Sequence, residues 1–167
     1  MRPACVLALV ALAAWPLTAR AEHANIDLRA IRIDPETGQD KDEAHAAADQ
    51  EPPAGGRNPR PLFKVKVNEP LVLQFVFTNT YPHGEKKNVT VRYFVAPETK
   101  PGQKTLPDLR QKVVTQGRFV LDLKPKAKVG SRVAFRLKAP GYYLLRVETL
   151  NTDSDHEHFS AIDLQAE

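Results

Sequence analysis

Short runs in which apolar and polar residues alternate are the feature that most restricts the fold of this chain. Residues 63–67, 89–95 and 133–137 all show this period of two, which is typical of a β-strand with one buried face. Residues 71–77 are apolar on both faces, which indicates a central strand. Turns rich in Pro and Gly separate the runs, and no segment after residue 21 shows a convincing helical pattern.

Residues 140–167 predict a closing hairpin. Pro140 and Gly141 form a turn before one strand, and a polar tip returns the chain into a second. The predicted strands, about eight in all, span residues 26–33, 63–67, 71–77, 89–95, 119–123, 133–137, 143–147 and 162–164. Short strands at this spacing predict an all-β fold, an antiparallel Greek-key β-sandwich. Residues 97–117 are too long for a hairpin turn, so we expect them to cross between the sheets.

The alternation also predicts which side chains face the core. Tyr143 is in phase with the apolar residues of its strand, so its ring should be buried and its hydroxyl should hold a neighbouring loop. Tyr142 and Leu144 have the opposite phase and should face outward. His158 is in phase with Ile162, which favours an inward, hydrogen-bonded histidine.

Residues 1–21 have the features of a signal peptide. Arg2 precedes an apolar stretch at residues 5–15, and Ala19, Arg20 and Ala21 provide a small-x-small cleavage site. The apolar stretch is shorter than the roughly 20 residues that a membrane-spanning helix needs. We therefore expect an exported protein, periplasmic or extracellular, with no membrane span.

The mature chain is expected to be a single β-sandwich domain, residues 22–167. It would contain no cysteine, because the only one, Cys5, lies in the signal peptide, so neither a disulfide nor thiolate chemistry is expected. Residues 34–61 are rich in Pro, Gly, Ala and acidic residues and predict a long mobile loop. Removing residues 1–21 lowers the net charge from +4 to +2, which argues against a nucleic-acid-binding protein.

Two segments resemble the cupredoxin pattern. Residues 75–83 (Phe-Val-Phe-Thr-Asn-Thr-Tyr-Pro-His) resemble the strand and Asn-containing turn that deliver a copper-ligating His in that family. Gly141-Tyr142-Tyr143, followed by a loop with His156 and His158, resembles the closing strand and ligand loop. The resemblance implies a metal site built from His83, His156 and His158. The mature chain lacks the Cys and Met of a blue-copper centre, so the implied metal is Cu(II) or zinc in a His-based site.

Residues 153–157 (Asp-Ser-Asp-His-Glu) also allow interpretations other than this metal site. Their oxygens are compatible with calcium, but the glycine and distal Glu of an EF-hand loop are missing. A solvated hairpin tip is the simpler interpretation. No nucleophile elbow, phosphate-binding loop or His-Glu-x-x-His motif occurs, so we do not expect an enzyme.

The strand pattern as a whole resembles exported immunoglobulin-like and fibronectin-III-like domains. This resemblance implies a non-enzymatic binding or accessory module without a cofactor, whose partner is a protein, a glycan or a small molecule. The alternative function is the cupredoxin-like metal binder described above.

Overall fold

The computed structural model describes residues 24–47, 60–80, 83–150 and 158–167, and these ranges form nine β-strands and no helix. The strands are β1 (Ala24–Ile33), β2 (Asp40–Ala47), β3 (Leu62–Val65), β4 (Leu71–Asn79), β5 (Lys86–Glu98), β6 (Thr115–Leu123), β7 (Lys128–Phe135), β8 (Gly141–Leu150) and β9 (Phe159–Ala166). Nothing in the described ranges is a helix long and apolar enough to cross a membrane.

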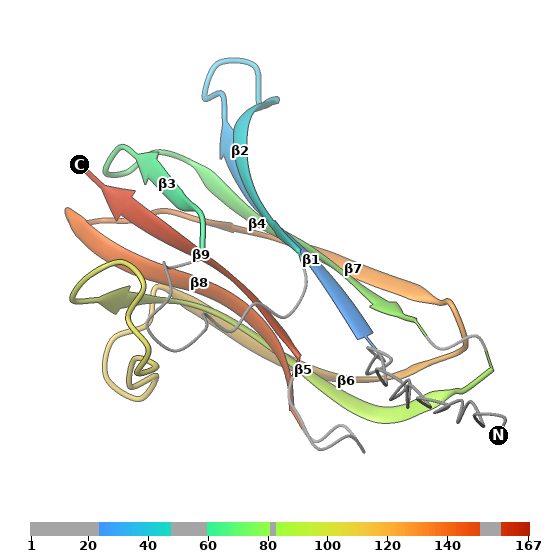
Figure 1. Ribbon diagram of the computed structural model, residues 1–167. Helices are drawn as coiled ribbons and strands as arrows, with labels where there is room; N and C mark the ends of the chain where they lie inside the picture. Colours follow the sequence, from blue (N-terminus) through green and yellow to red (C-terminus); the bar gives the residue numbers. More distant parts are fainter. Residues whose placement is uncertain (1–23, 48–59, 81–82, 151–157) are drawn as a thin grey trace, which may run out of the picture.

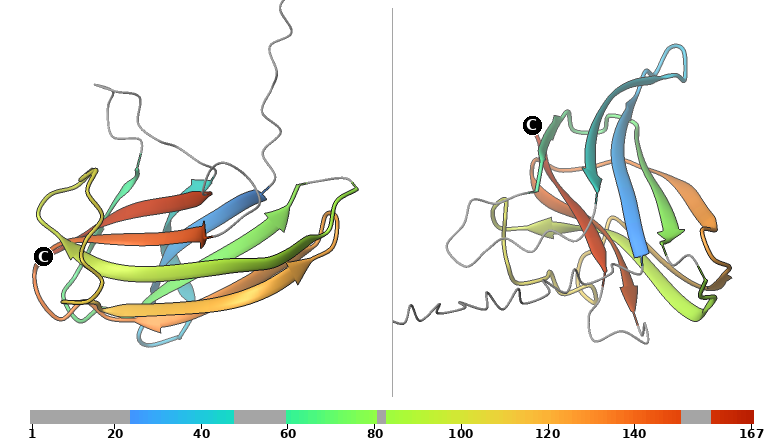
Figure 2. Two further views of the ribbon diagram at one scale, coloured as in Figure 1. Left: turned by 90° about the horizontal axis from the view of Figure 1, so that it is seen from below. Right: turned by 45° about the vertical axis from the view of Figure 1, so that its right-hand side comes forward.

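The strands form two sheets, which lie as two layers in Figures 1 and 2. One sheet has the order β2-β1-β4-β7, and the other has the order β3-β9-β8-β5-β6. All neighbouring strands are antiparallel except β3 and β9, which are parallel. The chain changes sheet after β2, after β3, after β4, after β6 and after β7. The predicted all-β, two-sheet sandwich is therefore confirmed.

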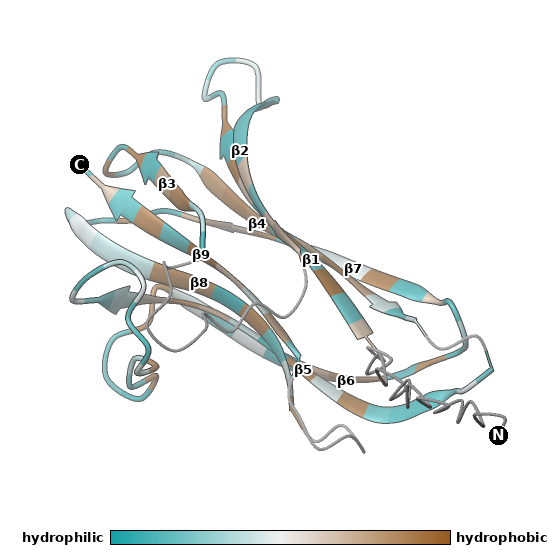
Figure 3. Ribbon diagram, viewed as in Figure 1, coloured by the Kyte–Doolittle hydropathy of each residue, from teal (hydrophilic) through white to brown (hydrophobic). Residues whose placement is uncertain are grey.

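The main core lies between the two sheets and follows the predicted alternation. Every second residue of β4 is buried, and β4 is the central strand that its apolar sequence predicts. Phe75 from this strand stacks on Phe119 of β6 with ring centroids 6.0 Å apart. Figure 3 shows the alternation as brown and teal bands along the strands, whereas β2 is mostly teal.

Two predictions about the closing hairpin are confirmed. Tyr143 is buried in the main core, and its hydroxyl donates a hydrogen bond of 2.8 Å to the carbonyl oxygen of Ala139. His158 is fully buried, as predicted, and its backbone NH donates to Thr149 Oγ1 at 3.1 Å, while the hydrogen bonding expected of its imidazole stays a prediction. The strand register inferred from alternation is thus the observed one.

Strand β2 lies inside the segment expected to be a loop, and the prediction was wrong over residues 40–47. This strand pairs with β1 through a turn in which Asp34 Oδ1 accepts hydrogen bonds from the backbone NH groups of Glu36 and Thr37. The missing apolar alternation reflects its place at the sheet edge, where most of its side chains are exposed. Residues 48–59, the rest of the expected loop, lie outside the described residues.

The segment between β5 and β6 does not cross between the sheets, contrary to the prediction, because these two strands are antiparallel neighbours in one sheet. Its residue Leu109 instead packs on the outer face of the five-stranded sheet, against a small second core. Leu144 points away from the main core, as predicted, but it is fully buried in this second core together with Phe94. The loop can be followed in yellow at the end of the sandwich where the C-terminus lies (Figure 2).

Candidate functional site

Strand register brings the ends of several strands together at one end of the four-stranded sheet. Leu71, the first residue of β4, pairs with Arg32 near the end of β1 and with Phe135 at the end of β7. Val114 and Thr115 contribute the beginning of β6 from the other sheet. The two layers therefore separate around a groove with walls from both sheets.

This groove has a volume of about 680 Å³ and is a candidate ligand site. We call it the basic groove, and its lining residues are Ile33, Gly38, Pro70, Leu71, Val72, Val114, Thr115, Arg132, Ala134, Phe135, Arg136 and Lys138. The lining combines an apolar floor with three cationic side chains and contains no carboxylate. Small-molecule sites typically have such a mainly apolar lining with a few polar groups.

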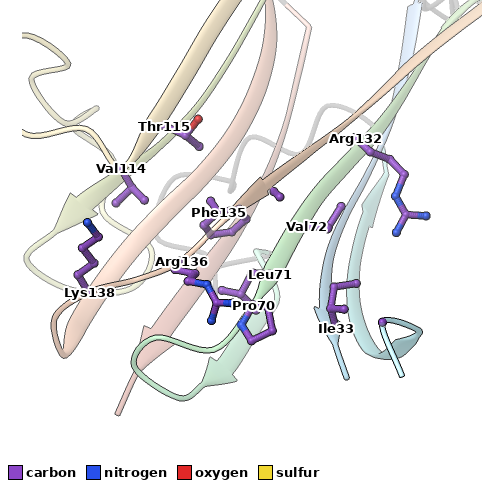
Figure 4. Close-up of a pocket in the computed structure, with 12 residues that line it drawn as sticks. Ile33, Pro70, Leu71, Val72, Val114, Thr115, Arg132, Phe135, Arg136 and Lys138 are labelled. Carbon is purple, nitrogen blue, oxygen red and sulfur yellow. The ribbon is translucent and has the colours of Figure 1, made fainter. Parts of the chain in front are cut away.

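The three cations occupy different parts of the rim. Arg136 lies next to Phe135, Lys138 lies on the side of Val114, and Arg132 lies at the opposite end, on the side of Ile33 (Figure 4). The Arg132 guanidinium is held by Asp40 Oδ1, 2.8 Å from Nη2, and Arg136 Nη1 donates to the backbone oxygen of Asn68.

Lys138 differs from the two arginines in its surroundings. Its ammonium group has no hydrogen-bond or ion-pair partner among the described residues. The groove thus presents uncompensated positive charge beside an apolar surface, which suits a ligand with an anionic group on an apolar body.

A buried ionic cluster lies under the loop between β5 and β6. Arg60 Nε lies 3.1 Å from Asp163 Oδ1, and Arg60 Nη1 lies 3.5 Å from Glu98 Oε1. The side chains of both acids are almost completely buried. The loop is attached to this cluster, because the Gly102 NH donates to Asp163 Oδ2 at 2.8 Å and Arg60 Nη2 donates to the Gln103 carbonyl at 3.0 Å.

Burial raises the pKa of Glu98 to about 7. Loss of solvation is the largest cause; the neighbouring charge of Asp163 also raises the pKa, while Arg60 lowers it. Neither oxygen of Glu98 accepts a hydrogen bond from the described residues. One guanidinium faces two carboxylates, so a proton on Glu98 leaves the cluster electrically balanced.

A second buried carboxylate, Glu148, lies on the same outer face. Arg92 Nε donates to its Oε1 at 2.6 Å, and Arg146 Nε donates to its Oε2 at 2.5 Å. The Arg146 guanidinium also lies 3.9 Å from the ring centroid of Phe159, within the range of a cation–π contact. These contacts hold β5, β8 and β9 together, and we assign this cluster a structural role.

The structure does not assemble the predicted three-histidine site from its described residues. His83 is exposed after β4, His158 is fully buried at the start of β9, and His156 lies outside the described residues, as does all of residues 153–157. Where residues are described, no group of three or more His, Cys, Asp or Glu side chains could hold a metal ion. The His83, His156 and His158 site therefore stays a prediction.

No sequence pattern pointed directly to the basic groove. Arg132, Arg136 and Lys138 are recognisable as the polar half of an alternating strand, but their role depends on the opposite sheet, which contributes Val114 and Thr115. The available signal was an edge strand whose polar positions include several cations. This signal is ambiguous, since lysine and arginine also protect sheet edges from aggregation.

Comparison with known proteins gives no family for this chain. No protein-family model matches it, and no curated protein matches it.

Proposed function

We propose that this protein is an exported, non-enzymatic binding module whose ligand occupies the basic groove. The observation that carries this proposal is the combination of an apolar floor with Arg132, Arg136 and Lys138 in a volume of about 680 Å³. The ligand class that fits is an anionic molecule, or an anionic segment of a partner, with an apolar part of similar size.

A Greek-key sandwich of the immunoglobulin-like class is the fold that we propose for this module. Its support is the way the chain changes sheet between β4 and β5 and between β6 and β7, together with the order β9-β8-β5-β6 in the second sheet. Loops and strand ends of such sandwiches commonly carry binding sites, because the sheets hold them rigidly.

The chemistry of the groove supports binding rather than catalysis. Thr115 supplies the only hydroxyl side chain of the lining, and the described lining contains no histidine, cysteine or carboxylate to act as its base. We expect no turnover of hydrolase or oxidase substrates by the purified protein. Turnover that disappears on substitution of Arg136 and Lys138 would contradict the proposal.

Anilinonaphthalenesulfonate, an anion on aromatic rings, is a suitable probe of the basic groove. We expect the native protein to bind it with increased fluorescence, and the variant Arg136→Gln/Lys138→Gln to bind it about tenfold more weakly, since each tenfold step corresponds to about 1.4 kcal/mol. The measurement is a fluorescence titration at two salt concentrations, because added salt should weaken binding to exposed cations.

The matched control removes two cations from the far end of the same strands. Lys124→Gln/Lys126→Gln changes the turn between β6 and β7 and leaves the groove lining intact. It should bind the probe like the native protein. Equal weakening in both double variants would mean that net charge, not the basic groove, attracts the anion.

Export is the remaining part of the proposal. We expect the secreted chain to begin at Glu22, which intact-mass analysis of the protein recovered outside the cytoplasm would show. A chain that keeps residues 1–21 and remains in the cytoplasm would contradict this expectation.

A further inference from the structure

Strand β6 forms one edge of the five-stranded sheet. It pairs with β5 along one side, and no other described strand lies along its second side. The exposed edge is nine residues long and contains no proline. An unpaired edge of this length presents backbone NH and C=O groups that can pair with another strand.

The outer face of β6 is self-complementary about Val120. Val120 is 59% exposed, and Arg118 and Asp122 lie two positions before and after it with the same outward orientation. If two copies of β6 pair in antiparallel fashion with Val120 on a two-fold axis, the Arg118 of each copy lies opposite Asp122 of the other. The two exposed valines then meet at the centre, so the interface joins an apolar contact to two ion pairs.

The side chains of Arg118 and Asp122 are both available to form these ion pairs. Arg118 has no hydrogen-bond or ion-pair partner among the described residues. Asp122 uses Oδ1 to accept the backbone NH of Asn88 at 2.8 Å, which orients the carboxylate and leaves Oδ2 available.

The inner face of β6 supports the same pairing. Phe119 and Leu121 point toward the core but are only partly buried, because the sheet ends at this strand. In the pairing centred on Val120, Phe119 of each copy lies opposite Leu121 of the other. A second copy would therefore cover the apolar side chains that the single chain leaves partly exposed.

We propose that this protein forms a two-fold symmetric dimer in which the β6 edges of two copies pair with Val120 at the centre. Pairing of this kind joins the two five-stranded sheets into one continuous sheet. A two-fold interface requires one surface to complement itself, and the equal spacing of Arg118 and Asp122 about Val120 meets this requirement. The dimer goes beyond the proposed ligand binding and does not depend on it.

Charge reversal gives a direct test by analytical ultracentrifugation of the full chain. Arg118→Asp places two carboxylates opposite each other at each end of the interface, and Asp122→Arg places two guanidinium groups there. Each single variant should raise the dimer dissociation constant at least about tenfold, because like charges directly opposite each other are destabilising. The double variant Arg118→Asp/Asp122→Arg should restore the dimer.

Mixing the two single variants separates this interface from a general effect on folding. The carboxylates at positions 118 and 122 of one variant would face the guanidinium groups of the other, so the mixture should form a heterodimer. Far-ultraviolet circular dichroism of each variant checks the fold. A native protein that stays monomeric at high concentration, or folded single variants that dimerise like the native protein, would overturn the proposal.

Disulfide trapping tests the register in a Cys5→Ser background. Directly opposite Cα atoms in an antiparallel pair lie about 4.5–5.5 Å apart, within the range of a disulfide, so Val120→Cys should cross-link. Arg118→Cys should not, because its symmetry mate is displaced by four residues, or roughly 13 Å. Cross-linking through Phe119→Cys instead would overturn the register, while Arg136→Gln/Lys138→Gln should leave the dimer unchanged.

Discussion

Tyr143→Ala should lower the free energy of unfolding by about 3–5 kcal/mol, because it removes a buried ring and leaves a cavity. The ring belongs to the main core and its hydroxyl holds Ala139 in the turn before β8. The measurement is equilibrium unfolding in urea, with the slope of the transition compared between native protein and variant to check two-state behaviour.

Two further variants divide this effect into parts. Tyr143→Phe keeps the ring and removes only the bond to Ala139, so it should cost about 1 kcal/mol. Tyr142→Ala changes the neighbouring, partly exposed ring and should also cost only about 1 kcal/mol. Equal losses for Tyr142→Ala and Tyr143→Ala would contradict the observed register of β8.

The buried carboxyl of Glu98 should make the protein less stable as the pH rises. Its pKa is about 7 in the folded protein and 4.5 as the ordinary value, so the folded state holds this proton more tightly than the unfolded state. The stabilisation that the folded protein gains from holding this proton is complete below pH 4.5 and is lost as the pH rises through about 7. The expected loss between these limits is on the order of 3 kcal/mol, since one pKa unit corresponds to about 1.36 kcal/mol.

Comparison with Glu98→Gln isolates this proton from the other titrating groups. The neutral amide imitates the protonated acid, so its stability advantage over the native protein should grow between pH 5 and 8, the range in which the native group ionises. Glu85→Gln, which removes an exposed carboxylate, is the control for loss of charge. If the free energy of unfolding changed with pH in the same way for the native protein and Glu98→Gln, the pH effect could not come from ionisation of Glu98.

Alternation was sufficient to predict most of the fold, because burial of one sheet face imposes a period of two. It located eight of the nine described strands, the central place of β4 and the inward side of Tyr143 and His158. It could not locate β2, whose sequence Asp-Lys-Asp-Glu-Ala-His-Ala-Ala has no apolar alternation. That strand depends on pairing with β1, a tertiary interaction that local sequence does not encode.

The sequence was less informative about what lies outside the main core. The alternation correctly predicted that Leu144 points away from the main core. It did not indicate that Leu109, in the loop between β5 and β6, packs over Leu144. The basic groove was missed for a similar reason, since Arg136 and Val114 come from different sheets and meet only after the sandwich has formed. Local patterns predict strands; sites built from distant segments need the tertiary structure.

The parallel pairing of β3 with β9 has a consequence for the rate of folding. Leu62 pairs with Asp163, about 100 residues away, and Ser160 Oγ donates to the carbonyl oxygen of Ile26, 134 positions apart. Contacts between such distant residues require closure of long loops before they contribute energy, so chains rich in them fold in milliseconds to seconds rather than microseconds. The newly made chain therefore passes through a period in which β9 is made but its partners β3 and β1 have yet to reach it.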